Sequence, residues 1–588
     1  MMVRWGEKSS AIVAGTIKGL PKIDTTSFDI DIEHLRTNAK DLAPLSRLAK
    51  LGDSQMKKLE GLGTLNVSAK VEGGIRDAAA VNLMAECNLG QLRTDATLRH
   101  LPRGYRFTLD AGSDALGLEM LRNEWLTRSG FDISVAGQWD GDLKTTDNWS
   151  QRLDMSIDGH LTNSMVKGRK LTTASISGGL KDGVLTAEVA SPDSLADLRV
   201  ELQADLADSV RSYAANATVN NLDIGLLPKP LSTNFSARLR GNTLDEMSGS
   251  AKARMTRYGD MELRNMDITI ETDNHGKEIE FTSDLADINL QGQFQYSDLP
   301  LMARYFRQRY LPEIFNPEET ADSTLATMLA DKTLACQVRW LDDGAILHGL
   351  LKNVTVAKGT RIDGTYNFGE QLKIAARSDS LRIGGVKLET LGLNGRLIGD
   401  RYVIQAETQA FDIGQMELLD RVQVTLGSSR QLATAELAWG DGDSPSRGDL
   451  MMALDGNTLQ VTRPQFFVGE TPWELVADQL TLENDGKLKI AGENISFESE
   501  QQKINARFSI KGQPNDCVEL FFNQFSLDLL SDVLLQNNPV DLRGEINGRF
   551  SLYGLNETPY FNANLTMDSC MVNAQPMGQM HLSSNWNA

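Results

Sequence analysis

The stretch Asp287–Tyr296, with the sequence DINLQGQFQY, alternates between two kinds of residue. Its even-numbered positions, from Ile288 to Tyr296, are apolar or glycine, and its odd-numbered positions are all Asp, Asn or Gln. Successive side chains of a β-strand point to opposite faces of the sheet. The spacing therefore predicts a strand with one apolar face and one polar face.

Similar alternation recurs from about residue 60 almost to the C-terminus. Leu198–Leu206 and Ile504–Ile510 show it, and so does a meander between Ser248 and Ser283. The meander is divided at Tyr258–Asp260 and Asp273–Gly276, where Gly, Asn and Asp suit tight hairpins. From the usual length of a strand and its turn we expect roughly 30 to 40 strands. The pattern predicts a mostly β protein with a very large, mostly antiparallel sheet.

The chain has no obvious internal boundary. None of its 588 residues falls in a long Pro/Gly/Ser-rich stretch, a low-complexity tract or a block of like charges. We therefore expect residues 1–588 to form one continuous segment without separable domains.

Two segments depart from the alternation. Residues 38–60 have leucines at helical spacing, and residues 299–330 read as a helical pair. The first helix of the pair ends near Pro312, and Asn316–Glu319 has the pattern of a helix start. Because that first helix mixes arginines with aromatic residues, it could contact lipid headgroups. The simpler interpretation is an amphipathic helix that covers the apolar face of the sheet.

Charge and motif content exclude several functions. A net charge of −20 argues against binding to nucleic acid and against electrostatic docking on anionic lipid. The sequence has no HExxH, GxSxG or GxGxxG motif, and its four cysteines are scattered, which excludes a disulfide framework or a clustered zinc site. Gly359–Thr365 has P-loop spacing, but threonine stands where the lysine is required. We expect no enzymatic activity, no metal and no cofactor.

Two pairs of acidic residues are the remaining candidates for a cation site or for acid–base chemistry. They are Asp29 with Asp31, and Asp342 with Asp343. Neighbouring carboxylates on a turn or a sheet edge are mostly solvated, and we interpret both pairs in this way.

The apolar face raises the functional question. Four inward Leu, Ile, Val or Phe side chains on one strand represent roughly 6 to 12 kcal/mol of burial, at about 1.5–3 kcal/mol each. Such a face must be covered, either by a second sheet, as in tandem β-sandwiches, or by apolar molecules held in a long groove. A carbohydrate-active β-rich enzyme is a third hypothesis. The periodicity does not decide between the sandwich and the groove.

A loose repeat gives a further indication. FDIDIEHL from Phe28, LDIGLLPKPL from Leu222, FDIGQMELL from Phe411 and FSLDLLSDVL from Phe525 share an apolar-x-Asp-apolar element or a close variant, followed by leucines. A Gly-x-x-x-Gly strand then follows in the last case, with Gly544 and Gly548. With the stretches Asn221–Met255 and Tyr305–Phe315, this pattern resembles the TamB/AsmA-like family of bridge-like lipid transfer proteins.

The resemblance implies a fold, a location and a function. It implies an elongated, curved antiparallel sheet that forms a U-shaped hydrophobic groove, with a few short helices. It also implies a periplasmic protein that conducts phospholipids between the inner and outer membranes and supports outer-membrane biogenesis. Assembly of outer-membrane proteins without lipid conduction is the alternative within the family, and a structural or adhesive tandem β-sandwich is the alternative outside it.

The resemblance also implies partners. The family has an N-terminal inner-membrane anchor and a C-terminal domain that meets an outer-membrane barrel of the TamA/BamA type. We find neither in this sequence, so we expect the chain to be a central segment of such a bridge. The residues expected to line the groove and to contact acyl chains are Leu198, Val200, Leu202, Leu206, Ile268, Ile270, Ile279, Phe281, Ile288, Leu290, Phe294, Tyr296, Ile504, Phe508 and Ile510.

Overall fold

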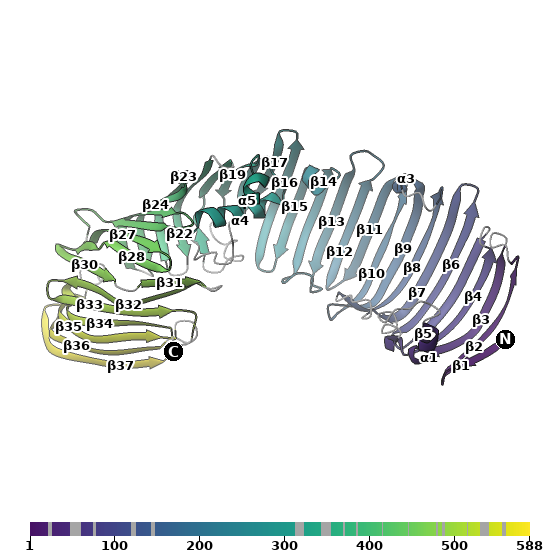
Figure 1. Cartoon of the computed structure of the whole chain (residues 1–588), viewed down its shortest axis with the longest axis horizontal. Helices are drawn as coiled ribbons and strands as arrows, with labels where there is room; N and C mark the ends of the chain where they lie inside the picture. The colour runs from purple at the N-terminus through teal and green to yellow at the C-terminus, as the bar shows by residue number, and fades with distance from the viewer. Residues whose placement is uncertain are drawn as a thin grey trace. The chain divides into compact units, whose positions relative to one another are not determined.

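The computed structural model is about 74% strand and 7% helix (Figure 1). It describes residues 1–20, 26–46, 60–74, 78–118, 125–142, 147–311, 323–342, 354–367, 371–383, 386–413, 416–444, 446–477, 480–484, 488–513, 516–529, 540–554 and 560–587. These residues form 37 strands, and the strand pairs described below are antiparallel. The predicted fold class is confirmed as a mostly β protein built from antiparallel strands, and the groove stays a prediction.

The described residues divide into two compact units, Met1–Glu271 and Thr272–Ala588, here called unit 1 and unit 2. The strands of unit 1 are β1 (Met2–Trp5), β2 (Ser9–Lys18), β3 (Ser27–Asn38), β4 (Thr64–Gly74), β5 (Ala78–Cys87), β6 (Gly90–Leu101), β7 (Gly104–Gly117), β8 (Leu126–Asp140), β9 (Leu153–Val166), β10 (Arg169–Lys181), β11 (Val184–Asp193), β12 (Ala196–Asp205), β13 (Ser212–Leu222), β14 (Leu231–Arg240), β15 (Ser248–Tyr258) and β16 (Met261–Asp273). Each strand pairs with the next one in sequence. Sixteen strands at 4.7–4.9 Å spacing give a sheet about 70 Å across.

Short helices accompany unit 1 at its loops. They are α1 (Ala39–Ser46), α3 (Trp149–Arg152) and a 3-10 turn at Leu244–Glu246. The predicted helical segment 38–60 is confirmed over α1, and residues 47–59 lie outside the described part of the chain.

The start of α1 is fixed by the buried carboxylate of Asp41. The Ser9 hydroxyl donates a hydrogen bond to this carboxylate at 2.7 Å, and the backbone N–H groups of Lys8 and Glu7 donate at 2.9 and 3.1 Å. The Asn38 side-chain oxygen in turn accepts the N–H of Asp41 at 2.9 Å, which is an N-cap contact. The carboxylate thus joins the β1–β2 turn to the helix.

These contacts predict a pH-dependent effect of Asp41→Asn. The Ser9 hydroxyl, followed by the Lys8 and Glu7 N–H groups, lowers the pKa of Asp41 to about 2. The stabilisation from a lowered pKa is present above the unfolded value of about 3.9 and is lost as the pH falls through the folded value. We expect faster amide exchange in β1 and β2 of the variant at pH 7, and a smaller difference from the unaltered chain below pH 4. Hydrogen exchange measured for both chains at each pH checks this; equal differences at pH 7 and pH 2 would contradict it.

Unit 2 contains the remaining strands. They are β17 (Gly276–Ser283), β18 (Ala286–Gly292), β19 (Thr333–Trp340), β20 (Val354–Val356), β21 (Arg361–Asn367), β22 (Gln371–Ile383), β23 (Val386–Ile398), β24 (Arg401–Ile413), β25 (Met416–Ser428), β26 (Ala433–Trp439), β27 (Ser446–Asp455), β28 (Thr458–Arg463), β29 (Gln465–Val468), β30 (Thr471–Ala477), β31 (Leu480–Asn484), β32 (Leu488–Ser499), β33 (Gln502–Ile510), β34 (Cys517–Ser526), β35 (Leu542–Tyr553), β36 (Tyr560–Val572) and β37 (Gln575–Asn587). The predicted meander is confirmed to within one residue over β15, β16 and β17.

One of the places where the pairing in unit 2 departs from sequence order lies between β27 and β32. Strands β28 and β29 both pair with β27 and are separated by Pro464, which has no N–H for a ladder. Strand β29 then pairs with β30, and β28 pairs with β31. Both partners continue to β32, so the sheet is carried across the interruption by two short strand pairs.

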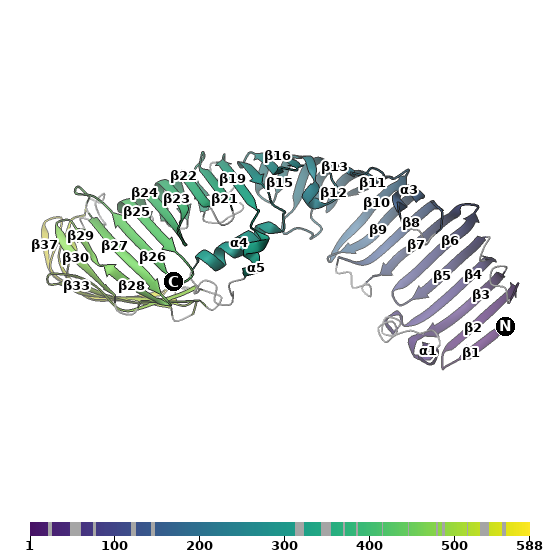
Figure 2. The ribbon, with the colours of Figure 1, turned by 45° about the horizontal axis from the view of Figure 1, so that its top comes forward.

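Unit 2 also contains the helices α4 (Asp298–Tyr310) and α5 (Ser323–Met328). They confirm the helical pair predicted over 299–330, whereas the predicted helix start at Asn316 lies outside the described residues. Figure 2 shows both helices on one side of the neighbouring strands.

The strand predicted to run through Tyr296 ends earlier, so that prediction is wrong in extent. Strand β18 ends at Gly292, where an added Cβ would lie 2.1 Å from the Thr333 carbonyl oxygen. Beyond it, the Gln295 N–H donates to the Asp298 carboxylate at 2.8 Å, and the Asp298 N–H donates to the Gln295 carbonyl at 2.9 Å. These two bonds turn the chain into α4.

Candidate functional site

One face of the unit 1 sheet has no polar side chain along its central line. Residues directly opposite each other in antiparallel strands have their side chains on the same face. Following these pairings from β2 to β16 gives one residue in each of fifteen strands, here called the central row of unit 1. Its members are Gly15, Ile30, Val71, Val81, Ala96, Leu109, Val135, Ile157, Gly178, Ala187, Leu202, Ala215, Ala237, Ala251 and Ile268.

The rows on either side are nearly as apolar. One contains a single polar residue, Thr94, and comprises Val13, Ile32, Ala69, Leu83, Thr94, Ala111, Ile133, Gly159, Ile176, Val189, Val200, Ala217, Phe235, Ala253 and Met266. Apart from the hydroxyl of Tyr213, the other is apolar or glycine and comprises Ile17, Phe28, Gly73, Ala79, Leu98, Phe107, Gly137, Met155, Leu180, Leu185, Ala204, Tyr213, Leu239, Gly249 and Ile270. We call these three rows the apolar face of unit 1.

The opposite face of the same strands is polar throughout its central line. From β3 to β16 this row comprises Asp31, Lys70, Asn82, Asp95, Asp110, Ser134, Asp158, Ser177, Glu188, Glu201, Asn216, Ser236, Lys252 and Asp267. Ion pairs connect some neighbours, such as Arg199 with Glu188 at 3.1 Å. The acidic charge of unit 1 therefore lies on the side away from the apolar face.

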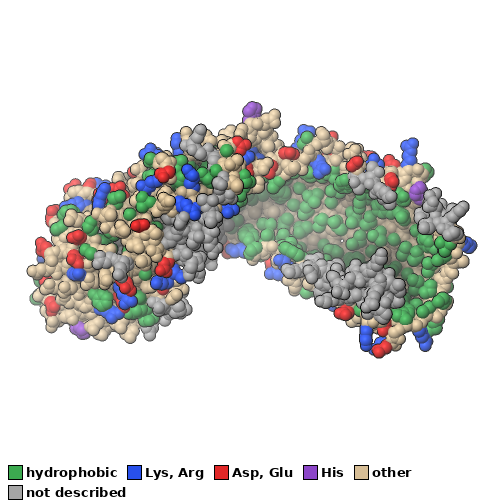
Figure 3. Space-filling view, viewed as in Figure 1, with side chains coloured by type: hydrophobic (Ala, Val, Ile, Leu, Met, Phe, Trp, Pro, Cys, Tyr) green, Lys and Arg blue, Asp and Glu red, His purple; other side chains and the backbone are tan. Residues whose placement is uncertain are grey.

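Much of the apolar face of unit 1 is open. Figure 3 shows it as a hollowed surface of hydrophobic side chains that extends across the strands. Six of its large side chains are between 37% and 45% exposed, namely Leu98, Leu109, Ile176, Leu185, Leu202 and Phe235. Apolar rows that run over fifteen strands and expose large side chains on at least six of them mark an interaction surface.

Unit 2 repeats the arrangement over its first half. Its central row, from β17 to β28, comprises Ile279, Leu290, Cys336, Gly364, Ile374, Gly395, Ile404, Leu426, Ala435, Met452 and Val461. The neighbouring row comprises Phe281, Ile288, Val338, Ile362, Ala376, Leu393, Ala406, Val424, Leu437 and Leu450. Ile362, Ile374 and Leu426 are 38–40% exposed, so this apolar face is also partly open.

A row along one rim of this face extends into the C-terminal strands of unit 2. Starting at β24 it comprises Tyr402, Ser428, Ala433, Leu454, Leu459, Leu480, Gly492, Phe508, Val518, Leu552, Phe561 and Trp586. Apart from Ser428 and the hydroxyl of Tyr402 it is apolar or glycine. We call it the rim row.

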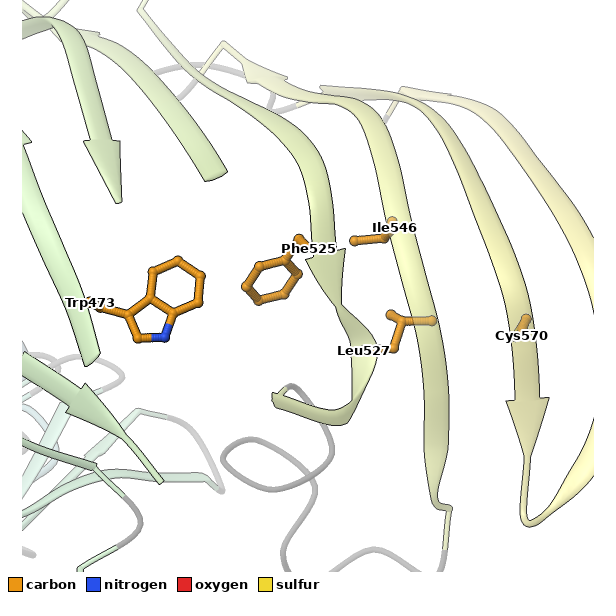
Figure 4. Packing of buried hydrophobic residues seen from close by; sticks show 5 residues of the cluster. All are labelled: Trp473, Phe525, Leu527, Ile546 and Cys570. Carbon is orange, nitrogen blue, oxygen red and sulfur yellow. The ribbon is translucent and has the colours of Figure 1, made fainter. Parts of the chain in front are cut away.

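Parts of the unit 2 face are covered by the protein itself. Trp473 on β30 packs edge-on against Phe525, with ring centroids 6.0 Å apart, although two strands separate β30 from β34 (Figure 4). Leu527, Ile546 and Cys570 complete this buried cluster. The sheet is thus curled enough at the ends of these strands for its apolar side chains to meet.

The residues predicted to line a groove are distributed as follows. Val200, Leu202, Ile268 and Ile270 belong to the apolar face of unit 1, and Leu198 lies on the same side of β12, next to Val200 in the alternation. Ile279, Phe281, Ile288 and Leu290 lie on the apolar face of unit 2. Ile504, Phe508 and Ile510 alternate along β33 on the side of the rim row. Leu206 follows β12 and donates its N–H to the Gly183 carbonyl at 2.9 Å.

Phe294 and Tyr296 are positioned differently from the other predicted residues, because they follow the end of β18. Phe294 is 7% exposed and packs with Met302 of α4 and Leu329 in a second buried cluster. Tyr296 packs against this cluster, and the Lys277 ammonium lies 3.7 Å from the centre of its ring. The two residues support α4 where the sequence pattern predicted a continued strand.

Other chemistry is sparse among the described residues. No three of their His, Cys, Asp or Glu side chains gather closely enough to hold a metal ion. Asp29 and Asp31 lie on the polar face, opposite Glu72 and Lys70. Asp342 is buried, and Asp343 lies outside the described part of the chain. The four cysteines are free, and burial raises the pKa of the Cys336 and Cys517 thiols.

Comparison with known proteins gives no further assignment. No family model matches this sequence, and no curated protein matches it. Among the described helices, none has both the length and the hydropathy required to cross a membrane. We therefore identify the apolar face as the candidate site from its apolar composition and its exposure alone.

Proposed function

We propose that the apolar face binds the acyl chains of phospholipids and lets them move across the sheet from one strand to the next. The observation that supports this most is the central row of unit 1, in which fifteen successive strands present only aliphatic side chains or glycine. Acyl chains are apolar and bind without directional contacts, so a surface of uniform chemistry has no single site at which they would be held. Headgroups would remain in water at the edge of the sheet.

The proposal extends to a place in the cell. A surface of this kind, within a longer protein anchored at both ends, would serve as the periplasmic segment of a TamB/AsmA-like bridge between the inner and outer membranes. Its partners would be phospholipids, an inner-membrane anchor and an outer-membrane barrel of the TamA/BamA type. The acidic polar face would then keep the bridge soluble between the two membranes.

Lipid analysis of the purified chain tests the proposal. We expect phospholipids to co-purify in several copies per chain after detergent-free washing, since many acyl chains fit along a sheet about 70 Å across. Mass spectrometry of the extracted lipid, normalised to protein, gives the number. A folded chain that carries no lipid and takes up none from phospholipid vesicles would contradict the proposal.

A structural role is the second candidate, and one observation favours it. The Trp473–Phe525 cluster is a protein-packed core on the apolar side of unit 2. If the face of unit 1 were covered in the same way by another protein surface, the chain would behave as part of a tandem β-sandwich or an adhesive assembly. Concentration-dependent self-association of the lipid-free chain, measured by analytical ultracentrifugation, would support this candidate.

A further inference from the structure

Helix α4 lies along the rim of the unit 2 apolar face. At its C-terminal end the Tyr310 carbonyl accepts a hydrogen bond from the Ser428 hydroxyl at 2.6 Å. The Gln308 carbonyl accepts a hydrogen bond from the Arg430 guanidinium at 3.3 Å. The Phe306 ring meets Tyr402 edge-on, with centroids 5.1 Å apart. Tyr402 and Ser428 both belong to the rim row, so this half of α4 covers apolar surface that continues into the C-terminal strands.

The two ends of α4 are held differently. The N-terminal half contributes Met302 to the cluster with Phe294 and Leu329, and Leu329 is fully buried. The C-terminal half packs Phe306 and Tyr310 against Tyr402 of the rim row, with Tyr310 only 6% exposed, and it accepts two hydrogen bonds at backbone carbonyls. A buried apolar cluster is costly to open, whereas carbonyls can exchange such hydrogen bonds for water. Acyl chains on the rim row can replace the apolar contacts of Phe306 and Tyr310, and water can replace the two hydrogen bonds, so the C-terminal half is the releasable end and the N-terminal half the firm end.

Tyr402 connects the helix to the central row of unit 2. It is 3% exposed, and its hydroxyl has no hydrogen-bond partner among the described residues. This hydroxyl reaches over Gly395, where an added Cβ would lie 2.3 Å from the hydroxyl oxygen. A buried hydroxyl without a partner is energetically costly, which disfavours the covered arrangement.

We propose that the C-terminal half of α4 is a displaceable strap, which covers the rim row in the lipid-free chain and lifts when acyl chains occupy the unit 2 face. This inference rests on the proposed function. Lifting the strap would uncover Tyr402 and the apolar surface beneath Phe306 and Tyr310. The cluster at the N-terminal half of α4 would act as the hinge.

Site-specific photo-crosslinking in the full chain tests the strap. In one variant Phe306 is replaced by p-benzoylphenylalanine, which reports contact of α4 with β24. In the matched variant Leu426, which is 40% exposed in the central row, carries the same group and reports lipid on the face. Each variant is irradiated with and without vesicles of phosphatidylethanolamine and phosphatidylglycerol. At saturating lipid we expect the Phe306–β24 adduct to fall by a factor on the order of ten while a lipid adduct forms at position 426.

The outcomes separate the two proposals. A lipid adduct at position 426 with an unchanged Phe306–β24 adduct would overturn the strap and leave the proposed function standing. Absence of a lipid adduct at position 426 would overturn lipid binding to this face, and the strap with it. Hydrogen exchange in the unaltered chain gives a second measurement that does not depend on how the larger side chain fits. Faster exchange of the last turn of α4 on adding vesicles is expected, and unchanged exchange would contradict the strap.

Discussion

Replacing Leu202 by aspartate is expected to lower the affinity for phospholipid roughly 100-fold on the part of the unit 1 face around residue 202. Little loss of stability is expected. Leu202 lies in the central row between Ala187 and Ala215, and it is 45% exposed. Because it is not part of a closed core, the substitution leaves no large cavity behind. Acyl chains lying over the new carboxylate would desolvate it, at a cost of about 2.5–3.5 kcal/mol on insertion scales.

The neighbouring residue provides a matched control. Gln203 lies on the same strand, β12, and its side chain is exposed on the polar face. Gln203→Asp therefore adds the same charge one residue away without placing it among the acyl chains. Lipid stoichiometry by mass spectrometry, together with uptake from vesicles, should separate the two variants. Equal lipid content in the Leu202 and Gln203 variants would contradict the proposed function.

The earlier end of β18 shows what the alternation could predict and what it could not. The pattern in Asp287–Tyr296 continues in the sequence past the point where the strand stops. The backbone turns after Gly292 because only glycine fits against the Thr333 carbonyl and because Asp298 accepts the Gln295 N–H. Thr333 is distant from the alternating stretch in the sequence. Asp298 follows the stretch closely, but nothing in the period-two pattern marks it as the point where the chain turns. Alternation thus predicted the face of each side chain in the strand, and contacts outside the pattern decided its length.

The sequence pattern also does not predict which parts of the apolar face other side chains of the protein cover. Trp473 and Phe525 are both apolar, but their meeting depends on the curl of strands that are not adjacent. The stretch that runs up to Pro312 did predict α4, and the preferred interpretation of it as a cover for the sheet agrees with the packing of Phe306 and Tyr310 near Tyr402. The loose repeat is less informative. Its first copy lies within β3, whereas its second begins at the last residue of β13.

The anchor of α4 should be the most sensitive point of unit 2. Leu329 is fully buried between Phe294 and Met302, and its replacement by alanine is expected to cost about 2–5 kcal/mol through lost burial and the cavity that remains. Met328 provides the matched control, because it is 55% exposed and Met328→Ala should change stability by less than about 0.5 kcal/mol.

Hydrogen exchange resolved by segment is the measurement for this pair of variants, because a chain with two compact units need not unfold in one step. In Leu329→Ala we expect much faster exchange in α4 and at the start of β19, with strands β4 to β12 of unit 1 unchanged. If the hinge assignment is correct, this variant should also lose contact between Phe306 and β24 without any lipid present. Protection of α4 equal to that in Met328→Ala would show that the buried cluster does not anchor the helix, and the firm end of the strap would have to be sought elsewhere.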